Sequence, residues 1–286
     1  MRILLTGANG QLGRCLQDRI PADWTLLPLA SADLDITHSE SVAVAVAEFK
    51  PDVIINAAAY TAVDKAENEV ELARQVNRQG PANLAQAAKD NNARFIHVST
   101  DYVFDGTSEK PYLETDTTNP LGVYGQTKLD GEKAVAEIFP DSIIVRTAWV
   151  FSEYGNNFLK TMLRVGEQRD VLSVVADQYG CPTYAGDIAN TIISLIKLDA
   201  EGGIYHFSGD QETSWHGFAK KIFDLALENS KIRHAPVVEA ITTDQYPTLA
   251  VRPTYSILSN RKIEVLGIKA SRWEEAIKDV LIKLKY

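Results

Sequence analysis

The first thirteen residues join a short apolar strand directly to a turn with three glycines. Residues 2–6 form the strand-like run, and Gly7, Gly10 and Gly13 follow it at every third position. Gly7 permits a tight turn, Gly10 lets backbone amides approach a pyrophosphate, and Gly13 lets a helix pack closely on the strand. The helix N-terminus offers free amides and a favourable dipole to such an anion. The pattern predicts a dinucleotide-binding unit, with an ordinary strand-to-helix turn as the alternative.

Short β-rich runs alternate with helical patterns through the first half of the chain. Further strands are expected at 25–30, 53–56, 94–99 and 143–147, and helices at 39–49, 71–91 and 124–138. Each helix is long enough for a right-handed crossover, so the strands are expected to run parallel. The sequence therefore predicts an α/β fold with a Rossmann-type doubly wound parallel sheet. Ligands of such sheets bind at the carboxyl ends of the strands.

Beyond about residue 150 the pattern becomes irregular and rich in loops, which predicts a smaller α/β substrate-binding domain. Residues 1–150 are assigned to the dinucleotide-binding domain, with returning segments near 184–198 and 236–258. The remainder, 151–183, 199–235 and 259–286, is assigned mainly to the substrate domain. Two helices are expected in this remainder, at 214–229 and 271–285.

Tyr124 and Lys128 are four positions apart, which places both side chains on one face of a helix. A neighbouring ammonium is expected to lower the pKa of the phenol and so favour proton exchange with an alcohol or ketone. Ser99 and Thr100 lie at the end of a predicted strand and should reach the same edge of the sheet. Alone, the Tyr/Lys pair is more typical of a solvated helix face than of a catalytic site. With the glycine turn, it indicates a nicotinamide-dependent carbonyl/alcohol site.

Charge and composition argue against several other classes of protein. The formal net charge is -9 and no basic run offsets it, so we expect no nucleic-acid partner. No apolar run approaches about 18 residues and no charged leader is present, so we expect a soluble protein without membrane contact. Cys15 and Cys181 form no Cys-x-x-Cys pair, and no cluster has metal-ligand spacing. We therefore expect no metal and a cytoplasmic location.

Longer blocks of the sequence resemble the extended short-chain dehydrogenase/reductase superfamily and, more narrowly, the dTDP-4-dehydrorhamnose reductases. These blocks lie at 7–13, 56–64, 99–106, 124–128, 146–151, 177–183 and 252–253, and so span nearly the whole chain. The resemblance implies reduction of the 4-keto group of dTDP-6-deoxy-L-lyxo-4-hexulose to dTDP-L-rhamnose, for cell-surface polysaccharide biosynthesis. NADPH or NADH would supply the hydride.

The same resemblance implies roles for individual residues. Tyr124 would donate a proton, Thr100 would polarise the carbonyl, and Lys128 would tune Tyr124 and bind the ribose of the cofactor. Trp149 would present an apolar face to the sugar, and Arg252 would suit a diphosphate. Cofactor contacts are expected from Gly7, Gly10, Gln11, Leu12, Gly13, Asp35, Ile36, Ala57, Ala58, Ala59, Ser99, Tyr124 and Lys128. Substrate contacts are expected from Thr100, Tyr102, Tyr124, Trp149, Asn157, Gln178 and Arg252.

Two positions bear on cofactor choice and assembly. The second predicted strand ends in Ala30-Ser31-Ala32, with neither an acid to hold a ribose hydroxyl nor an arginine to hold a 2'-phosphate, so we predict use of both reduced cofactors. Cys15 stands in the first helix, where some similar proteins carry a glutamate of a magnesium-linked dimer. A thiol is a poor ligand for that hard cation. A homodimer is compatible with the sequence, but a metal-linked one is not expected.

Two other functions remain open from the sequence. The first is a related nucleotide-sugar epimerase or dehydratase. Such dehydratases would carry an acid after Thr-Asp, whereas Tyr102 follows Thr100-Asp101 here, which speaks against a dehydratase. The second is a noncatalytic binding protein, because a regulatory subunit of methionine adenosyltransferase resembles the same reductases.

Overall fold

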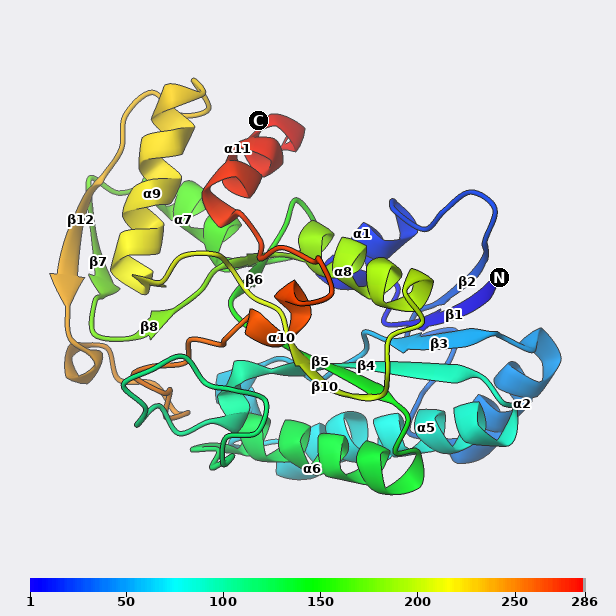
Figure 1. Ribbon diagram of the computed structural model, residues 1–286. Coiled ribbons are helices and arrows are strands. Elements are labelled where there is room, and N and C mark those ends of the chain that lie inside the picture. The colour runs from blue at the N-terminus through cyan, green and yellow to red at the C-terminus, as the bar shows by residue number, and fades with distance from the viewer. Residues whose placement is uncertain (285–286) are drawn as a thin grey trace.

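A six-stranded parallel sheet forms the centre of the larger part of the molecule (Figure 1). The computed structural model describes residues 1–284. The strands lie in the order β10-β5-β4-β3-β1-β2, and each pairs in parallel with its neighbour. Their bounds are β1 Arg2–Thr6, β2 Thr25–Leu29, β3 Val53–Asn56, β4 Arg94–Thr100, β5 Ile143–Thr147 and β10 Gly203–His206. The predicted Rossmann-type α/β fold is confirmed.

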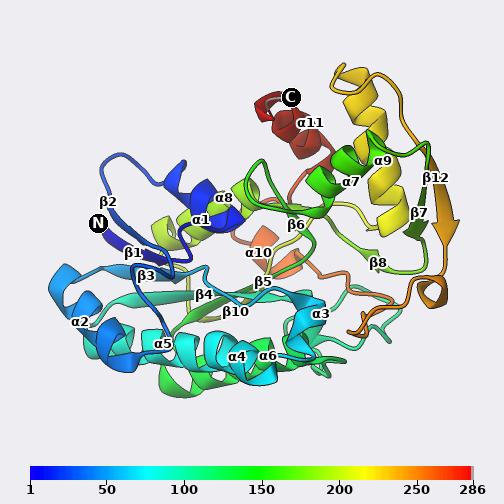
Figure 2. The ribbon, with the colours of Figure 1, turned by 180° about the vertical axis from the view of Figure 1, so that it is seen from behind.

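The central strands bury both faces, which explains why they read as continuous apolar runs. Along β1, Ile3 and Leu5 pack with one layer of helices, whereas Leu4 packs with the other. The first layer contains α1 Gln11–Gln17 and α8 Ala185–Lys197. The second contains α2 Ser39–Phe49, α5 Gly80–Asp90 and α6 Val123–Ile138. Figure 2 shows both layers from behind.

The connection between β3 and β4 is not the single helix predicted at 71–91. α3 Val63–Ala66 and α4 Val70–Arg74 are followed by a π-helical turn, Gln75–Gln79, which leads into α5. Within the turn, the buried Asn77 accepts a hydrogen bond from the Tyr60 amide at 2.8 Å and donates one to Thr127 Oγ1 at 3.1 Å. The wider turn thus ties the loop after β3 to α6.

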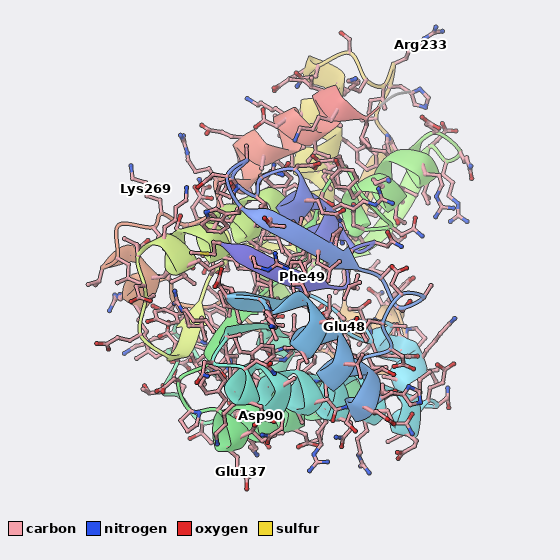
Figure 3. The ribbon with its side chains drawn as sticks, turned by 90° about the vertical axis from the view of Figure 1, so that its right-hand side faces the viewer. Glu48, Phe49, Asp90, Glu137, Arg233 and Lys269 are labelled. Atoms are coloured by element: carbon pink, nitrogen blue, oxygen red, sulfur yellow. The ribbon has the colours of Figure 1, made fainter. Side chains whose placement is uncertain are left out.

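The remaining chain forms a smaller part around three helices. α7 Phe158–Gly166, α9 Trp215–Glu228 and α11 Trp273–Lys283 share one apolar cluster. Short strand pairs adjoin it: β6 Val150–Phe151 with β9 Thr183–Tyr184, β8 Tyr179–Gly180 with β11 Thr213–Ser214, and β7 Val171–Val175 with β12 Val237–Ile241. α10 Arg261–Glu264 and two 3-10 turns, Asp101–Val103 and Thr243–Gln245, complete the described elements. In Figure 3, Arg233 of this part and Glu137 of α6 lie at opposite ends of the molecule.

Two strands depart from the domain boundaries expected from the sequence. β10 lies within 199–235, which was assigned mainly to the substrate domain, yet it pairs with β5 at the edge of the main sheet. α8 covers one face of the same sheet. The chain that follows α8 therefore reaches the free edge of β5 directly. β12 lies within 236–258, which was expected to return to the first domain, yet it pairs with β7 beside α9. The division into domains otherwise stays a prediction.

The two later helices lie close to their expected positions. The helix expected at 214–229 is α9, and the one expected at 271–285 is α11, residue 285 being outside the described residues. Within 1–284, no helix has both the length and the apolar character that crossing a membrane requires.

Candidate active site

A cavity of about 760 Å³ opens at the carboxyl ends of β1, β3, β4 and β5. It lies where parallel sheets of this topology bind ligands. The predicted site residues that line it are Gly7, Gly10, Gln11, Leu12, Asp35, Ile36, Ala57, Ala58, Ala59, Ser99, Thr100, Tyr102, Tyr124, Lys128, Trp149 and Asn157. The structure therefore brings together residues that are far apart in the sequence, whereas Gly13, Gln178 and Arg252 are not among the lining residues.

The glycine turn leaves a cradle that side chains would fill. Gly7 has φ +73°, and a Cβ there would lie 2.6 Å from the Ala57 carbonyl oxygen. A Cβ on Gly13 would overlap the Gly7 carbonyl oxygen, so α1 can approach the turn only with glycine at this position. No side chain caps α1 at Gly10. This backbone-lined cradle, with the small residues after β3, fits a dinucleotide pyrophosphate.

One end of the cavity is bounded by the loop after β2. Asp35 accepts hydrogen bonds from the Thr37 amide at 2.9 Å and the Thr37 hydroxyl at 2.8 Å, and these hydrogen bonds lower the pKa of its carboxyl. Asp33 accepts a hydrogen bond from the Ala30 amide at 2.9 Å, which engages it within its own turn. The nearby Ile36 is buried. Cofactor preference at this loop stays a prediction.

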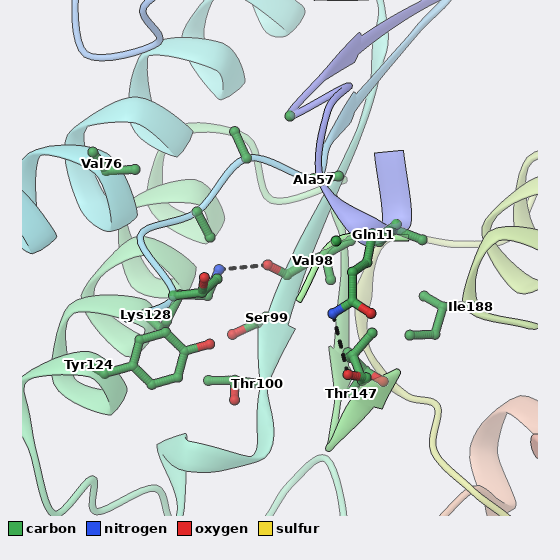
Figure 4. A pocket seen from close by; sticks show the side chains of 18 of the residues that line it. Gln11, Ala57, Val76, Val98, Ser99, Thr100, Tyr124, Lys128, Thr147 and Ile188 are labelled. Carbon is green, nitrogen blue, oxygen red and sulfur yellow. Dashed lines mark hydrogen bonds between the residues drawn. The ribbon is translucent and has the colours of Figure 1, made fainter. Parts of the chain in front are cut away.

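The three expected catalytic side chains converge from β4 and α6. Thr100 is the last residue of β4, and Tyr124 and Lys128 lie one turn apart near the start of α6. Figure 4 shows the Tyr124 hydroxyl directed toward Ser99 and Thr100. Lys128 is only 2% exposed, and its ammonium donates a hydrogen bond to the Val98 carbonyl oxygen at 2.7 Å.

The pKa of Tyr124 differs from the sequence-based expectation. Burial raises the pKa of Tyr124 to about 12, although a hydrogen bond with Thr100 opposes the shift. Burial also lowers the pKa of Lys128 to about 8. The predicted lowering of the Tyr124 pKa by Lys128 is therefore wrong in this structure, because burial raises this pKa and the Lys128 ammonium is engaged by Val98. Tyr124 is a protonated phenol at neutral pH, suited to donate a proton.

Asp101 lies directly behind Thr100, and no pattern in the sequence indicates a role for it. The Thr100 hydroxyl donates a hydrogen bond to Asp101 Oδ1 at 3.0 Å and accepts one from the Tyr102 amide at 3.2 Å. Asp101 is 1% exposed, and burial raises its pKa to about 6. The Tyr102 ring meets the Tyr124 ring edge to face, with centroids 5.5 Å apart. These contacts fix the orientation of both Thr100 and Tyr124.

The far end of the cavity is lined by two tryptophans, of which the sequence had indicated only Trp149. Trp149 stacks on Trp215 with ring centroids 3.5 Å apart and planes 5° apart. Trp215 is the first residue of α9, and no motif in the sequence connects it to Trp149. Both indoles line the same cavity as Tyr124.

Asn157 and Gln11 link the glycine turn to the smaller part of the chain. Asn157 caps α7 by accepting a hydrogen bond from the Lys160 amide at 3.1 Å. Its amide group donates to Gln11 Oε1 at 2.9 Å and to the Ser152 carbonyl oxygen at 2.8 Å. Gln11 Oε1 also accepts from the Ser152 hydroxyl at 2.9 Å. The Asn157 side chain is thus already engaged by protein groups, and its expected substrate contact stays a prediction.

Gln178 and Arg252 are held by other side chains. Gln178 is buried and donates a hydrogen bond to Thr243 Oγ1 at 3.1 Å. Arg252 forms a bidentate ion pair with Asp64, at 2.6 and 3.1 Å, and this pairing lowers the pKa of Asp64. The pair joins α3 to the segment after β12. A substrate diphosphate would therefore compete with Asp64 for Arg252.

Comparison with known proteins identifies the family. The family model described as RmlD substrate binding domain matches residues 1–286. A dTDP-4-dehydrorhamnose reductase of Aggregatibacter actinomycetemcomitans is 49% identical, covering 98% of each chain. The crystal structure of a dTDP-4-dehydrorhamnose reductase from Clostridium acetobutylicum has a TM-score of 0.93 and 41% identity, covering 99% of this chain and 100% of that one. That of the Bacillus anthracis dTDP-4-dehydrorhamnose reductase, in complex with NADP, has a TM-score of 0.93 and 40% identity, covering 99% of each. The chain belongs to the RmlD substrate binding domain family, that of the dTDP-4-dehydrorhamnose reductases.

Proposed function

We propose that this protein reduces the 4-keto group of dTDP-6-deoxy-L-lyxo-4-hexulose to dTDP-L-rhamnose, with NADPH or NADH as the reductant. The observation that carries the proposal is the position of Tyr124, Lys128 and Thr100, which line one cavity together with the glycine turn. The family membership supports the substrate. The NADP complex of the Bacillus anthracis relative supports the cofactor.

The nucleotide-binding half of the cavity has the features that the cofactor requires. Gly7, Gly10 and Gly13 provide the cradle for the pyrophosphate, and Ala57 to Ala59 leave room beside it. Lys128 lines the cavity, and we assign its ammonium to a ribose hydroxyl of the cofactor. When bound, NADPH or NADH supplies the hydride that is added to the carbonyl carbon of the sugar.

Protein groups then act on the carbonyl oxygen. As negative charge develops on that oxygen, Tyr124 donates its proton, and a C–H and an O–H bond replace the C=O π bond. A phenol with a pKa near 12 keeps its proton at neutral pH and gives it up to the more basic developing alkoxide. Thr100 would turn its hydroxyl proton from Asp101 toward the same oxygen, while the Tyr102 amide, which donates to the Thr100 hydroxyl, holds Thr100 in place.

The location and assembly of the protein are part of the proposal. We place it in the cytoplasm, which the two free, buried cysteines support. Burial raises the pKa of Cys15 to about 12, so its thiol stays protonated and is unsuited to link two copies through magnesium. Homodimerisation without metal is tested by measuring the mass of the native protein in solution, with and without a chelator.

The direct test is turnover of the enzymatically generated keto-sugar. Purified protein is mixed with the 4-keto sugar and NADPH or NADH, cofactor oxidation is followed, and the sugar product is identified. One equivalent of dTDP-L-rhamnose for each cofactor oxidised, with comparable efficiency for both cofactors, is expected. A changed sugar without net cofactor oxidation would indicate an epimerase instead, and cofactor binding without turnover would indicate a binding protein.

A further inference from the structure

We propose that Trp215 is a positioning residue, which holds Trp149 in a left-handed backbone conformation at the substrate end of the cavity. The proposal rests on the proposed function, because Trp149 is the residue expected to face the sugar. Trp215 acts through Trp149 and is not assigned a substrate contact of its own.

The backbone of Trp149 supplies the first observation. Its φ is +46°, in the left-handed region that bulky L residues rarely adopt. Such a conformation persists only where the surrounding structure imposes it, and it is found preferentially at functional sites. Trp149 lies between β5 and β6, separated from β5 by Ala148, and lines the cavity that contains Tyr124.

The geometry of the tryptophan pair supplies the second observation. The two rings overlap face to face, with centroids 3.5 Å apart and planes 5° apart. Isolated aromatic pairs favour offset or edge-to-face arrangements over such overlap. The packing is therefore set by the chain segments that carry the rings rather than by the preference of the rings themselves.

Two short strands hold these segments in place. β8 pairs with β11 so that Thr213 lies opposite Gly180, and Trp215 follows β11 directly. A Cβ on Gly180 would lie 2.6 Å from Nε1 of Trp149, so the indole fits against the backbone of β8 only because this residue is glycine. Trp149 is thus confined by Gly180 of one strand and by Trp215 after the other.

Trp215 is itself anchored in the smaller part of the molecule. Ser214 caps α9 by accepting a hydrogen bond from the Gly217 amide at 3.1 Å. The Trp215 ring contacts Phe158, with centroids 4.7 Å apart, and lies 6.3 Å from the Phe218 ring. This apolar support fixes Trp215 independently of any ligand. It allows Trp215 to act as a fixed surface against which Trp149 is held.

The arrangement predicts a specific kinetic effect. Without Trp215, Trp149 can leave its strained conformation. The sugar then loses the indole surface of Trp149 that orients its carbonyl toward Tyr124. Binding of the cofactor to the glycine turn does not depend on this indole surface. Removal of the Trp215 ring should therefore change the KM and kcat for the keto-sugar and leave the affinity for NADPH unchanged.

A double-mutant cycle tests this effect. Trp215→Leu should lower kcat/KM for the keto-sugar about tenfold, the scale of a lost aromatic pair, and change the Kd for NADPH less than about twofold. Trp215→Phe should restore most of the activity. The double variant with Trp215→Leu and Trp149→Leu should have the same kcat/KM for the keto-sugar as Trp149→Leu alone. If the fold-loss in kcat/KM of the double variant equals the product of the two single fold-losses, the proposal is overturned.

A substrate-free measurement tests the stack itself. Two overlapping indoles give an exciton couplet in circular dichroism, which should disappear in Trp149→Leu, Trp215→Leu and Trp215→Phe. Trp24→Phe is the matched control, because Trp24 lies outside the cavity next to Lys197, and this variant should retain both the couplet and the activity. Absence of the couplet from the wild-type protein would overturn the proposal. A wild-type protein with the couplet but no turnover would instead contradict the proposed function.

Discussion

Replacing Lys128 with methionine should make the protein more stable while removing its activity. The Lys128 side chain is almost fully buried, and its ammonium has one hydrogen-bond acceptor, the Val98 carbonyl oxygen, among the described residues. Burial lowers its pKa from 10.5 to about 8, so the folded protein holds the proton less tightly than the unfolded chain does. Methionine has a similar length and carries no charge to desolvate.

The expected gain follows from the two pKa values. A pKa of about 8 in the folded state against 10.5 in the unfolded state corresponds to about 3 kcal/mol of lost stability at pH 7. Because the folded pKa is the lower one, this loss is largest below pH 8 and disappears as the pH rises toward 10.5. It falls to about 2 kcal/mol at pH 9 and about 1 kcal/mol at pH 10. Losing the hydrogen bond to Val98 takes about 1 kcal/mol from the gain.

Thermal unfolding without ligand provides the assay. Lys128→Met should raise the free energy of unfolding by about 2 kcal/mol at pH 7, or about 4 °C in Tm for a chain of this size. The gain should shrink steadily between pH 8 and pH 10, and kcat/KM should fall about 100-fold or more. Lys133→Met is the matched control, because Lys133 lies exposed on the same helix and should show neither effect. A variant less stable than the wild type at pH 7, or a gain independent of pH, would refute this reasoning.

Three further substitutions test other parts of the structure. Tyr124→Phe removes the proton donor and keeps the packing, so kcat should fall about 100-fold or more with little change in NADPH affinity; near-normal turnover would contradict the assigned role. Glu132→Ala leaves the buried Arg146 guanidinium without its carboxylate partner, so urea denaturation should show a loss of about 3–5 kcal/mol, and a loss within error would exclude this account of the pair. Gly13→Val introduces a Cβ that overlaps the Gly7 carbonyl oxygen and should weaken NADPH binding in a fluorescence titration; wild-type affinity would argue against the cradle.

The strands of the central sheet were predictable because local sequence determines them. Residues 53–55 and 143–145 are apolar on both faces, and β3 and β5 have the predicted bounds. The sixth strand, β10, was not predicted. It has only four residues and begins with glycine, and its place depends on the free edge of β5.

The π-helical turn also escaped prediction. It depends on the contacts of Asn77 with Tyr60 and Thr127, 17 and 50 positions away, and not on the periodicity of its own residues. A periodic pattern alone can predict that a segment is helical. It cannot reveal that tertiary contacts widen one turn of the helix into a π-helical turn, which holds an additional residue.

Some features of the candidate site were predictable from local sequence patterns, and others depend on tertiary contacts. The glycine turn and the Tyr124 and Lys128 pair are local patterns, and the structure places them on one cavity. The stack of Trp149 on Trp215 and the pairing of Asp64 with Arg252 join residues 66 and 188 positions apart, so no local spacing indicates them. The raised pKa of Tyr124 depends on burial, which its four-residue spacing from Lys128 does not report.

The most direct test of the proposed chemistry follows the hydride itself. The protein is incubated with the keto-sugar and NADPH that carries deuterium at the transferable position, and the product is analysed by NMR and mass spectrometry. The account predicts dTDP-L-rhamnose with deuterium at C4 and one equivalent of oxidised cofactor, and no such product from Tyr124→Phe within the same time. Product without deuterium at C4, or sugar conversion without net cofactor oxidation, would contradict it.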